Sequence, residues 1–108
     1  MSTERQTDVL DVVVRRLVDA FQPERIYLFG SRARGDHHED SDYDLMVLVL
    51  DSDCESHERI VEAHRVVAGL GVAVQVFMWP TEKFERQLPV VASLPSAIMR
   101  EDRLLYAS

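Results

Sequence analysis

The chain has 108 residues, of which 46% are hydrophobic, so it fits one compact domain over residues 1–108 with a single core. Its 12 lysines and arginines face 19 aspartates and glutamates, and the resulting formal net charge of −7 argues against nucleic acid as a partner. The first eight residues are polar, and the longest apolar runs are too short to span a bilayer, so we expect a cytoplasmic protein without membrane contact.

The first half of the chain predicts one helix and two strands. A helix is expected from Thr3 to Phe21, because apolar residues recur there at helical spacing after a capping box of Thr3 and Gln6. The segment RIYLFG at 25–30 is typical of a buried strand that stops at its glycine. The segment DYDLMVLVLD at 42–51 predicts a second strand, since acids alternate with apolar residues before the run becomes wholly apolar.

The second half predicts a further strand among helices. In chain order we expect a helix opened by a capping box of Ser52 and Glu55 and ended at Gly69 or Gly71, a strand at 72–79, a helix at 81–87, a helix from Pro95, and a closing strand or tail at 103–107. This order predicts an α+β fold, a small mixed β-sheet covered by helices.

Two carboxylates mark the start of the second predicted strand. Asp42 and Asp44 are separated by one residue, so on a strand they point to the same face. Two ionised carboxylates repel each other, and a hard divalent cation such as Mg²⁺ is a natural opposing charge. Two solvated acids at a strand end are the alternative interpretation.

A Gly-Ser turn follows the first predicted strand. Gly30 lets another group approach the backbone closely, and Ser31 supplies a hydroxyl and exposed backbone N–H groups. Arg32 and Arg34 add positive charge that suits a triphosphate. The alternatives are an ordinary helix cap and, for Arg34, an ion pair with a local acid.

The segment GSRARGDHHEDSDYDL, Gly30 to Leu45, resembles the signature of the minimal nucleotidyltransferase (MNT) family of the DNA polymerase β-like nucleotidyltransferase superfamily. The resemblance implies the nucleotidyltransferase (polymerase β-like) fold and Mg²⁺-dependent transfer of a nucleoside monophosphate, here AMP from ATP, to an acceptor hydroxyl. It also implies a HEPN-family protein partner, with this chain as the antitoxin of a toxin–antitoxin pair. The residues it implicates are Asp42 and Asp44 as metal-binding catalytic acids, and Gly30, Ser31, Arg32 and Arg34 as phosphate-binding residues.

One position departs from the family pattern. The family carries a third acid on the next strand, and VAVQVFMWPTEKF places Gln75 there, as anchored by Phe84 nine residues later. Its amide oxygen coordinates a metal weakly and cannot act as a base. The alternative function is therefore a catalytically weakened binding module that neutralises or scaffolds a HEPN-like partner. Acids of the polar turn that could substitute are Asp36, Glu39 and Asp40.

Other residues favour structural roles. Phe77 and Trp79 share a strand face with Gln75, and core or interface packing is expected for them over base stacking. His64 lies on the apolar stripe of the second predicted helix, where we expect a partly buried and hydrogen-bonded side chain. The short sheet with an apolar third strand leaves a homo-oligomer open as a further expectation.

Overall fold

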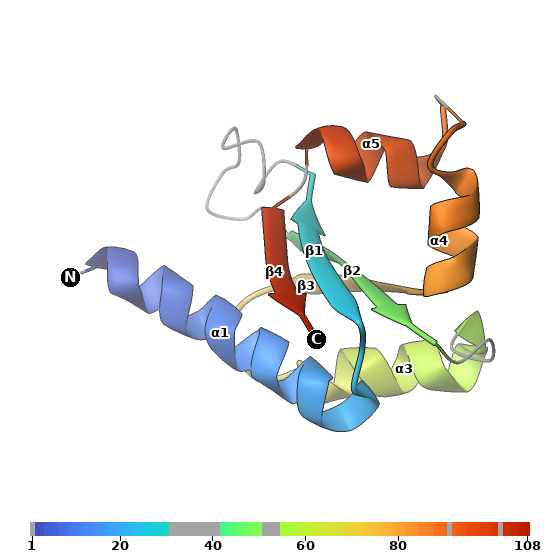
Figure 1. Cartoon of the computed structure of the whole chain (residues 1–108). Coiled ribbons are helices and arrows are strands. Elements are labelled where there is room, and N and C mark those ends of the chain that lie inside the picture. Colours follow the sequence, from blue (N-terminus) through green and yellow to red (C-terminus); the bar gives the residue numbers. More distant parts are fainter. Residues whose placement is uncertain (1, 31–41, 51–54, 91, 102) are drawn as a thin grey trace.

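The computed structural model of the chain describes residues 2–30, 42–50, 55–90, 92–101 and 103–108. Its elements are α1 (Ser2–Phe21), β1 (Arg25–Phe29), β2 (Tyr43–Val49), α3 (His57–Val66), β3 (Val74–Pro80), α4 (Thr81–Gln87), α5 (Leu94–Glu101) and β4 (Arg103–Ala107) (Figure 1). The predicted strands and helices are present in the predicted order, and the closing segment is a strand rather than a tail. None of the helices in the described part of the chain is long and apolar enough to cross a membrane.

The described strands form one four-stranded sheet in the order β3-β2-β1-β4. β1 is antiparallel to both β2 and β4, whereas β2 and β3 are parallel. Parallel neighbours need a crossover, and α3 lies in the connection between β2 and β3. The predicted mixed sheet is thus confirmed, with β2 as one of its two central strands.

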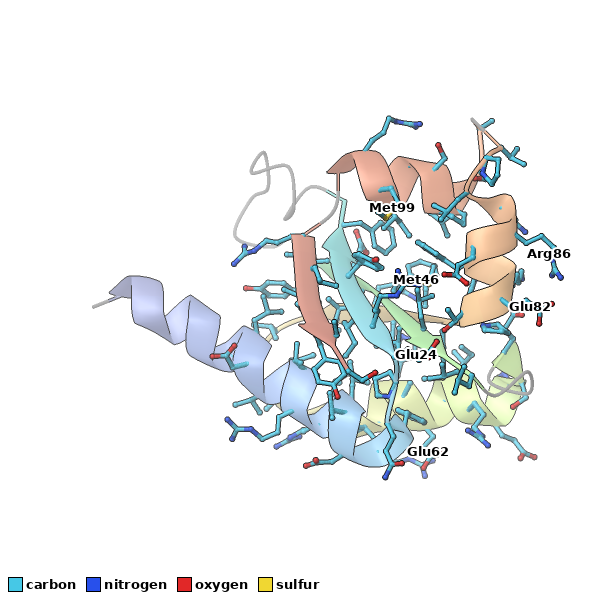
Figure 2. All side chains as sticks on the ribbon, viewed as in Figure 1. Glu24, Met46, Glu62, Glu82, Arg86 and Met99 are labelled. Carbon is cyan, nitrogen blue, oxygen red and sulfur yellow. The ribbon has the colours of Figure 1, made fainter. Side chains whose placement is uncertain are left out.

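Helices cover both faces of the sheet. Figure 1 shows α1 and α3 on one side and α4 and α5 on the other. Along β2, Leu45 and Val47 pack into the cluster on the α1 and α3 side, while Met46 and Leu48 pack into the cluster that includes Phe84 of α4. Figure 2 shows Met46 near the centre of the molecule. Burial on both faces explains why β2 is apolar without alternation beyond Asp44.

The start of α3 differs from the prediction. The helix is capped by Ser56, whose side chain accepts a hydrogen bond of 3.3 Å from the backbone N–H of Arg59. The helix therefore begins after Ser56, and the predicted opening by a capping box of Ser52 and Glu55 was wrong. Ser52 itself lies outside the described residues. Glu55 has another partner, because its carboxylate lies 2.7 Å from Lys83 Nζ.

His64 joins α3 to the outer strand β3. Its Nδ1–H donates to the carbonyl of Ile60 at 2.9 Å, and its Nε2 accepts from the backbone N–H of Val76 at 3.2 Å. This pairing fixes a neutral tautomer, since a carbonyl can only accept and a backbone N–H can only donate. The predicted partly buried, satisfied histidine is confirmed.

Candidate active site

The ends of three neighbouring strands meet at one edge of the sheet. Phe29 is the register partner of Asp44 in the antiparallel β1–β2 pair, and Asp44 is the register partner of Gln75 in the parallel β2–β3 pair. Register partners on adjacent strands lie on the same face, with strands about 4.8 Å apart. Asp44 therefore lies between an aromatic side chain and an amide, on the face that α4 and α5 cover.

Gly30 makes room for the carboxylate of Asp44. Its φ is +80°, and a Cβ at this position would lie 2.4 Å from Asp44 Oδ2. Real Cβ contacts are never this short, so a side chain here would push the carboxylate away. The close approach predicted for Gly30 exists, and the group that approaches is Asp44 itself.

The two acids influence each other electrostatically. Partial burial, followed by the nearby charge of Asp42, raises the pKa of Asp44 above its ordinary value of 3.8. Asp42 itself is exposed immediately before β2. In the predicted carboxylate pair Asp44 is thus partly desolvated and Asp42 is solvated. A bound cation would relieve the repulsion between them.

The residues around Asp44 fit one hard cation shared with a substrate. Among the described residues no group of three or more His, Cys, Asp or Glu could hold a metal ion. Mg²⁺ is often held by only one or two carboxylates together with phosphate oxygens. Asp42 and Asp44 fit that pattern, with the exposed Gln75 amide as a weak neutral donor beside them.

The other predicted site residues lie beyond the described part of the chain. Ser31, Arg32 and Arg34 belong to the segment 31–41, and so do the substitute acids that the sequence offered, Asp36, Glu39 and Asp40. Of the predicted phosphate-binding turn, the structure describes Gly30 alone. Its position beside Asp44 joins the turn to the acid pair.

An aromatic pair borders the site, and one of its members was not singled out in the sequence. The rings of Phe29 and Phe77 have centroids 5.5 Å apart and are tilted by 52°. Both side chains are half-buried against the cluster between the sheet and α4 and α5. The expected packing role of Phe77 is confirmed, as is that of Trp79, whose ring lies 4.2 Å from Lys83 Nζ. Phe29 was recognisable only once strand register made it the partner of Asp44.

Comparisons with known proteins agree with the fold. The chain is similar to a crystal structure of a toxin–antitoxin with AMP-PNP, with 24% identity, a TM-score of 0.67, and coverage of 91% of this chain and 73% of that chain. A mutant of the toxin–antitoxin MntA-HpeT gives 24% identity, a TM-score of 0.63, and coverage of 89% and 70%. A candidate nucleotidyltransferase from Sulfolobus solfataricus gives 19% identity, a TM-score of 0.61, and coverage of 98% and 84%.

These likenesses establish the fold, and the sequence establishes the family. A search of curated proteins gave no match. The family model for the nucleotidyltransferase domain matches residues 10–104, which include both acids, Gly30 and all four strands apart from the last residues of β4. The expected nucleotidyltransferase fold is confirmed, and the chain belongs to the nucleotidyltransferase domain family.

Proposed function

We propose that the chain is an Mg²⁺-dependent nucleotidyltransferase that transfers AMP from ATP to a hydroxyl group of a partner protein. The observation that carries the proposal is the closeness of the Asp44 carboxylate to Gly30, where a Cβ would lie 2.4 Å from Asp44 Oδ2. It joins the start of the phosphate-binding turn to the acid pair in a space that only a glycine leaves open. A triphosphate on the turn and a cation on the acids would therefore be neighbours.

The residues divide into two groups. Asp42 and Asp44 would hold Mg²⁺, which when bound neutralises phosphate charge and polarises the α-phosphate. The phosphates would bind to the turn, through the residues Gly30, Ser31, Arg32 and Arg34. Backbone N–H groups and guanidinium groups are the donors that phosphate oxygens prefer.

The transfer has a simple balance of atoms. The acceptor oxygen forms a bond to the α-phosphorus, the bond from that phosphorus to the α,β-bridging oxygen breaks, and pyrophosphate leaves with the electron pair. The amide of Gln75 cannot accept the hydroxyl proton, so this proton passes to water or to one of the acids that the sequence offers as substitutes, Asp36, Glu39 and Asp40. Loss of a positioned base costs about 100- to 10,000-fold in rate, so we expect slow turnover on a bound partner.

The nucleotide and the partner are proposed from the similar structures. One neighbour is a toxin–antitoxin with AMP-PNP, which supports an adenine nucleotide, and another is the toxin–antitoxin MntA-HpeT. These likenesses support an antitoxin role for this chain with a HEPN-family toxin as its partner. The acceptor hydroxyl would then belong to the toxin.

Gln75 favours a second candidate function. A neutral side chain beside Asp44 supplies no charge for a second Mg²⁺, so the chain would bind nucleotide and partner without transferring AMP. In this case it is a binding module that neutralises the toxin by contact.

One labelling assay separates the two functions. The chain is incubated with Mg²⁺, ATP labelled in the α-phosphate, and the protein encoded by the adjacent gene. Transfer of label that disappears in Asp42→Ala and Asp44→Ala supports the enzyme, and label that survives both substitutions contradicts it. If the natural chain transfers no label and Gln75→Asp does, the binding module is the correct function.

A further inference from the structure

One strand of the sheet has a face that the described helices leave uncovered. On the side of α4 and α5, α4 packs against β2 and β3, and α5 packs against β1 (Figure 1). β4 lies beyond β1, at the outer edge of the described sheet. The face of β4 on this side is therefore the part of the described sheet that neither helix covers.

A β-bulge decides which side chains of β4 lie on that face. The register between β1 and β4 shifts within the pair, so Leu105 and Tyr106 both pack against the cluster on the α1 and α3 side. Leu104 is the register partner of Tyr27, whose side chain packs into the cluster on the α4 and α5 side. Leu104 consequently lies on the uncovered face, where it is 52% exposed.

A cavity of about 520 Å³ continues this face toward α4. It lies where β1 begins and β4 ends, and Leu50 on its rim is 78% exposed. Its charged lining residues are three carboxylates and one guanidinium, from Glu24, Glu82, Glu85 and Arg25. Arg25 pairs with Glu85 at 3.4 Å, so the lining keeps an excess of negative charge. The cavity and Leu104 together form one surface, apolar in part and acidic in part, which we call the β4 surface.

The β4 surface has the length of a short helix. Strand register places Leu104 and Leu50 about 13 Å apart along the strands and about 10 Å apart across them, a separation of about 16 Å. Three turns of an α-helix also span about 16 Å. A helix laid over β4 would thus reach from one leucine to the other.

We propose that the β4 surface binds a basic amphipathic helix of a partner protein, about three turns long. A helix that packs on a sheet buries one apolar stripe, and Leu104 and Leu50 offer contacts to both ends of such a stripe. The acidic cavity complements lysine or arginine side chains beside the stripe. A second copy of this chain fits less well, because it also has a formal net charge of −7 and like charges oppose association.

The test titrates the chain into two fluorescent peptides of about 14 residues and follows their anisotropy. Both peptides are alanine-rich helices with the same stripe of leucines. One carries three lysines beside the stripe, and the other carries three glutamates at the same positions. We expect the lysine peptide to bind saturably and at least about 10-fold more tightly than the glutamate peptide, with an advantage that shrinks as NaCl is raised.

Substitutions in the chain locate the binding. Leu104→Ser and Leu50→Ser should each weaken binding of the lysine peptide about 3- to 10-fold, because each removes an apolar contact. Val61→Ser is the matched control, since Val61 is an exposed apolar residue of α3 on the other face of the sheet, and it should change nothing. Glu24→Gln should weaken binding about 2- to 5-fold, whereas Glu62→Gln on α3 should not.

Each contrary result has a distinct meaning. Equal affinities of the two peptides, no binding of either, or equal losses in Leu104→Ser and Val61→Ser would overturn the inference. So would a natural chain that sediments as a dimer and becomes a monomer in Leu104→Ser, because a second copy would then cover the β4 surface. Peptide binding needs no nucleotide, so a failure of AMP transfer would overturn the proposed function and leave this inference standing.

Discussion

Replacing Gly30 by alanine should damage the site in a way that can be calculated from the structure. The substitution has two costs, because the backbone has a φ of +80° and the new Cβ lies 2.4 Å from Asp44 Oδ2. An L-residue in the left-handed region costs about 1–2 kcal/mol. To reach ordinary contact the oxygen must retreat by about 1 Å, and overpacking of this kind costs a further ~1–3 kcal/mol.

Gly69 provides a matched control. Its φ is +79°, and a Cβ there would meet nothing within 4 Å. Gly69→Ala therefore carries the backbone cost alone, and urea unfolding should show that Gly30→Ala loses about 1–3 kcal/mol more. The excess should vanish when Gly30→Ala is made in a chain that already carries Asp44→Ala, because the clashing carboxylate is gone.

The same displacement should reduce activity. A misplacement of about 1 Å at a reacting centre can cost about 100-fold in rate, so AMP transfer by Gly30→Ala should fall by that order while Gly69→Ala keeps the natural rate. Equal stability losses in the two alanine variants, together with unchanged transfer by Gly30→Ala, would show that the new Cβ does not displace the carboxylate of Asp44.

Two further substitutions test electrostatics and packing. Because the pKa of Asp44 is raised in the folded chain, its ionised form opposes folding above that pKa, and the opposition disappears as pH falls below 3.8. Without metal, Asp44→Asn should therefore stabilise the chain at pH 7 but not at pH 3. The gain at pH 7 should be less than about 1 kcal/mol, because the group is partly exposed to solvent. A loss of stability at pH 7 in urea unfolding would contradict this expectation. His64→Leu leaves the N–H of Val76 without its acceptor and should cost about 1–3 kcal/mol, whereas His57→Leu at an exposed position should stay within about 0.5 kcal/mol. Equal effects of the two histidine substitutions on the unfolding free energy would show that the hydrogen bond is not needed.

Most of the fold could be predicted because hydrophobic periodicity and helix-breaking residues carry the element order. The start of α3 could not, since Ser52 and Ser56 are residues of the same type, both suited to capping a helix, and the sequence pattern does not choose between them.

The site shows the same division between local and distant information. The spacing of Asp42 and Asp44 predicts that they share one face of the strand. A glycine at the end of the first strand predicts that another group approaches the backbone closely at Gly30. Which group approaches depends on the register between β1 and β2, as does the position of Phe29 beside Asp44. Register is set by the packing of whole strands, so neither feature follows from the sequence pattern alone.

The proposed function requires that the acid pair and the glycine turn form a single site for a metal-bound nucleotide. Calorimetric titration of ATP into the chain, with Mg²⁺ and with a chelator in its place, measures this directly. We expect saturable binding that requires Mg²⁺ and is lost in the double variant Asp42→Asn, Asp44→Asn. Binding of equal affinity in that variant, or in the absence of the metal, would contradict a single site of this kind.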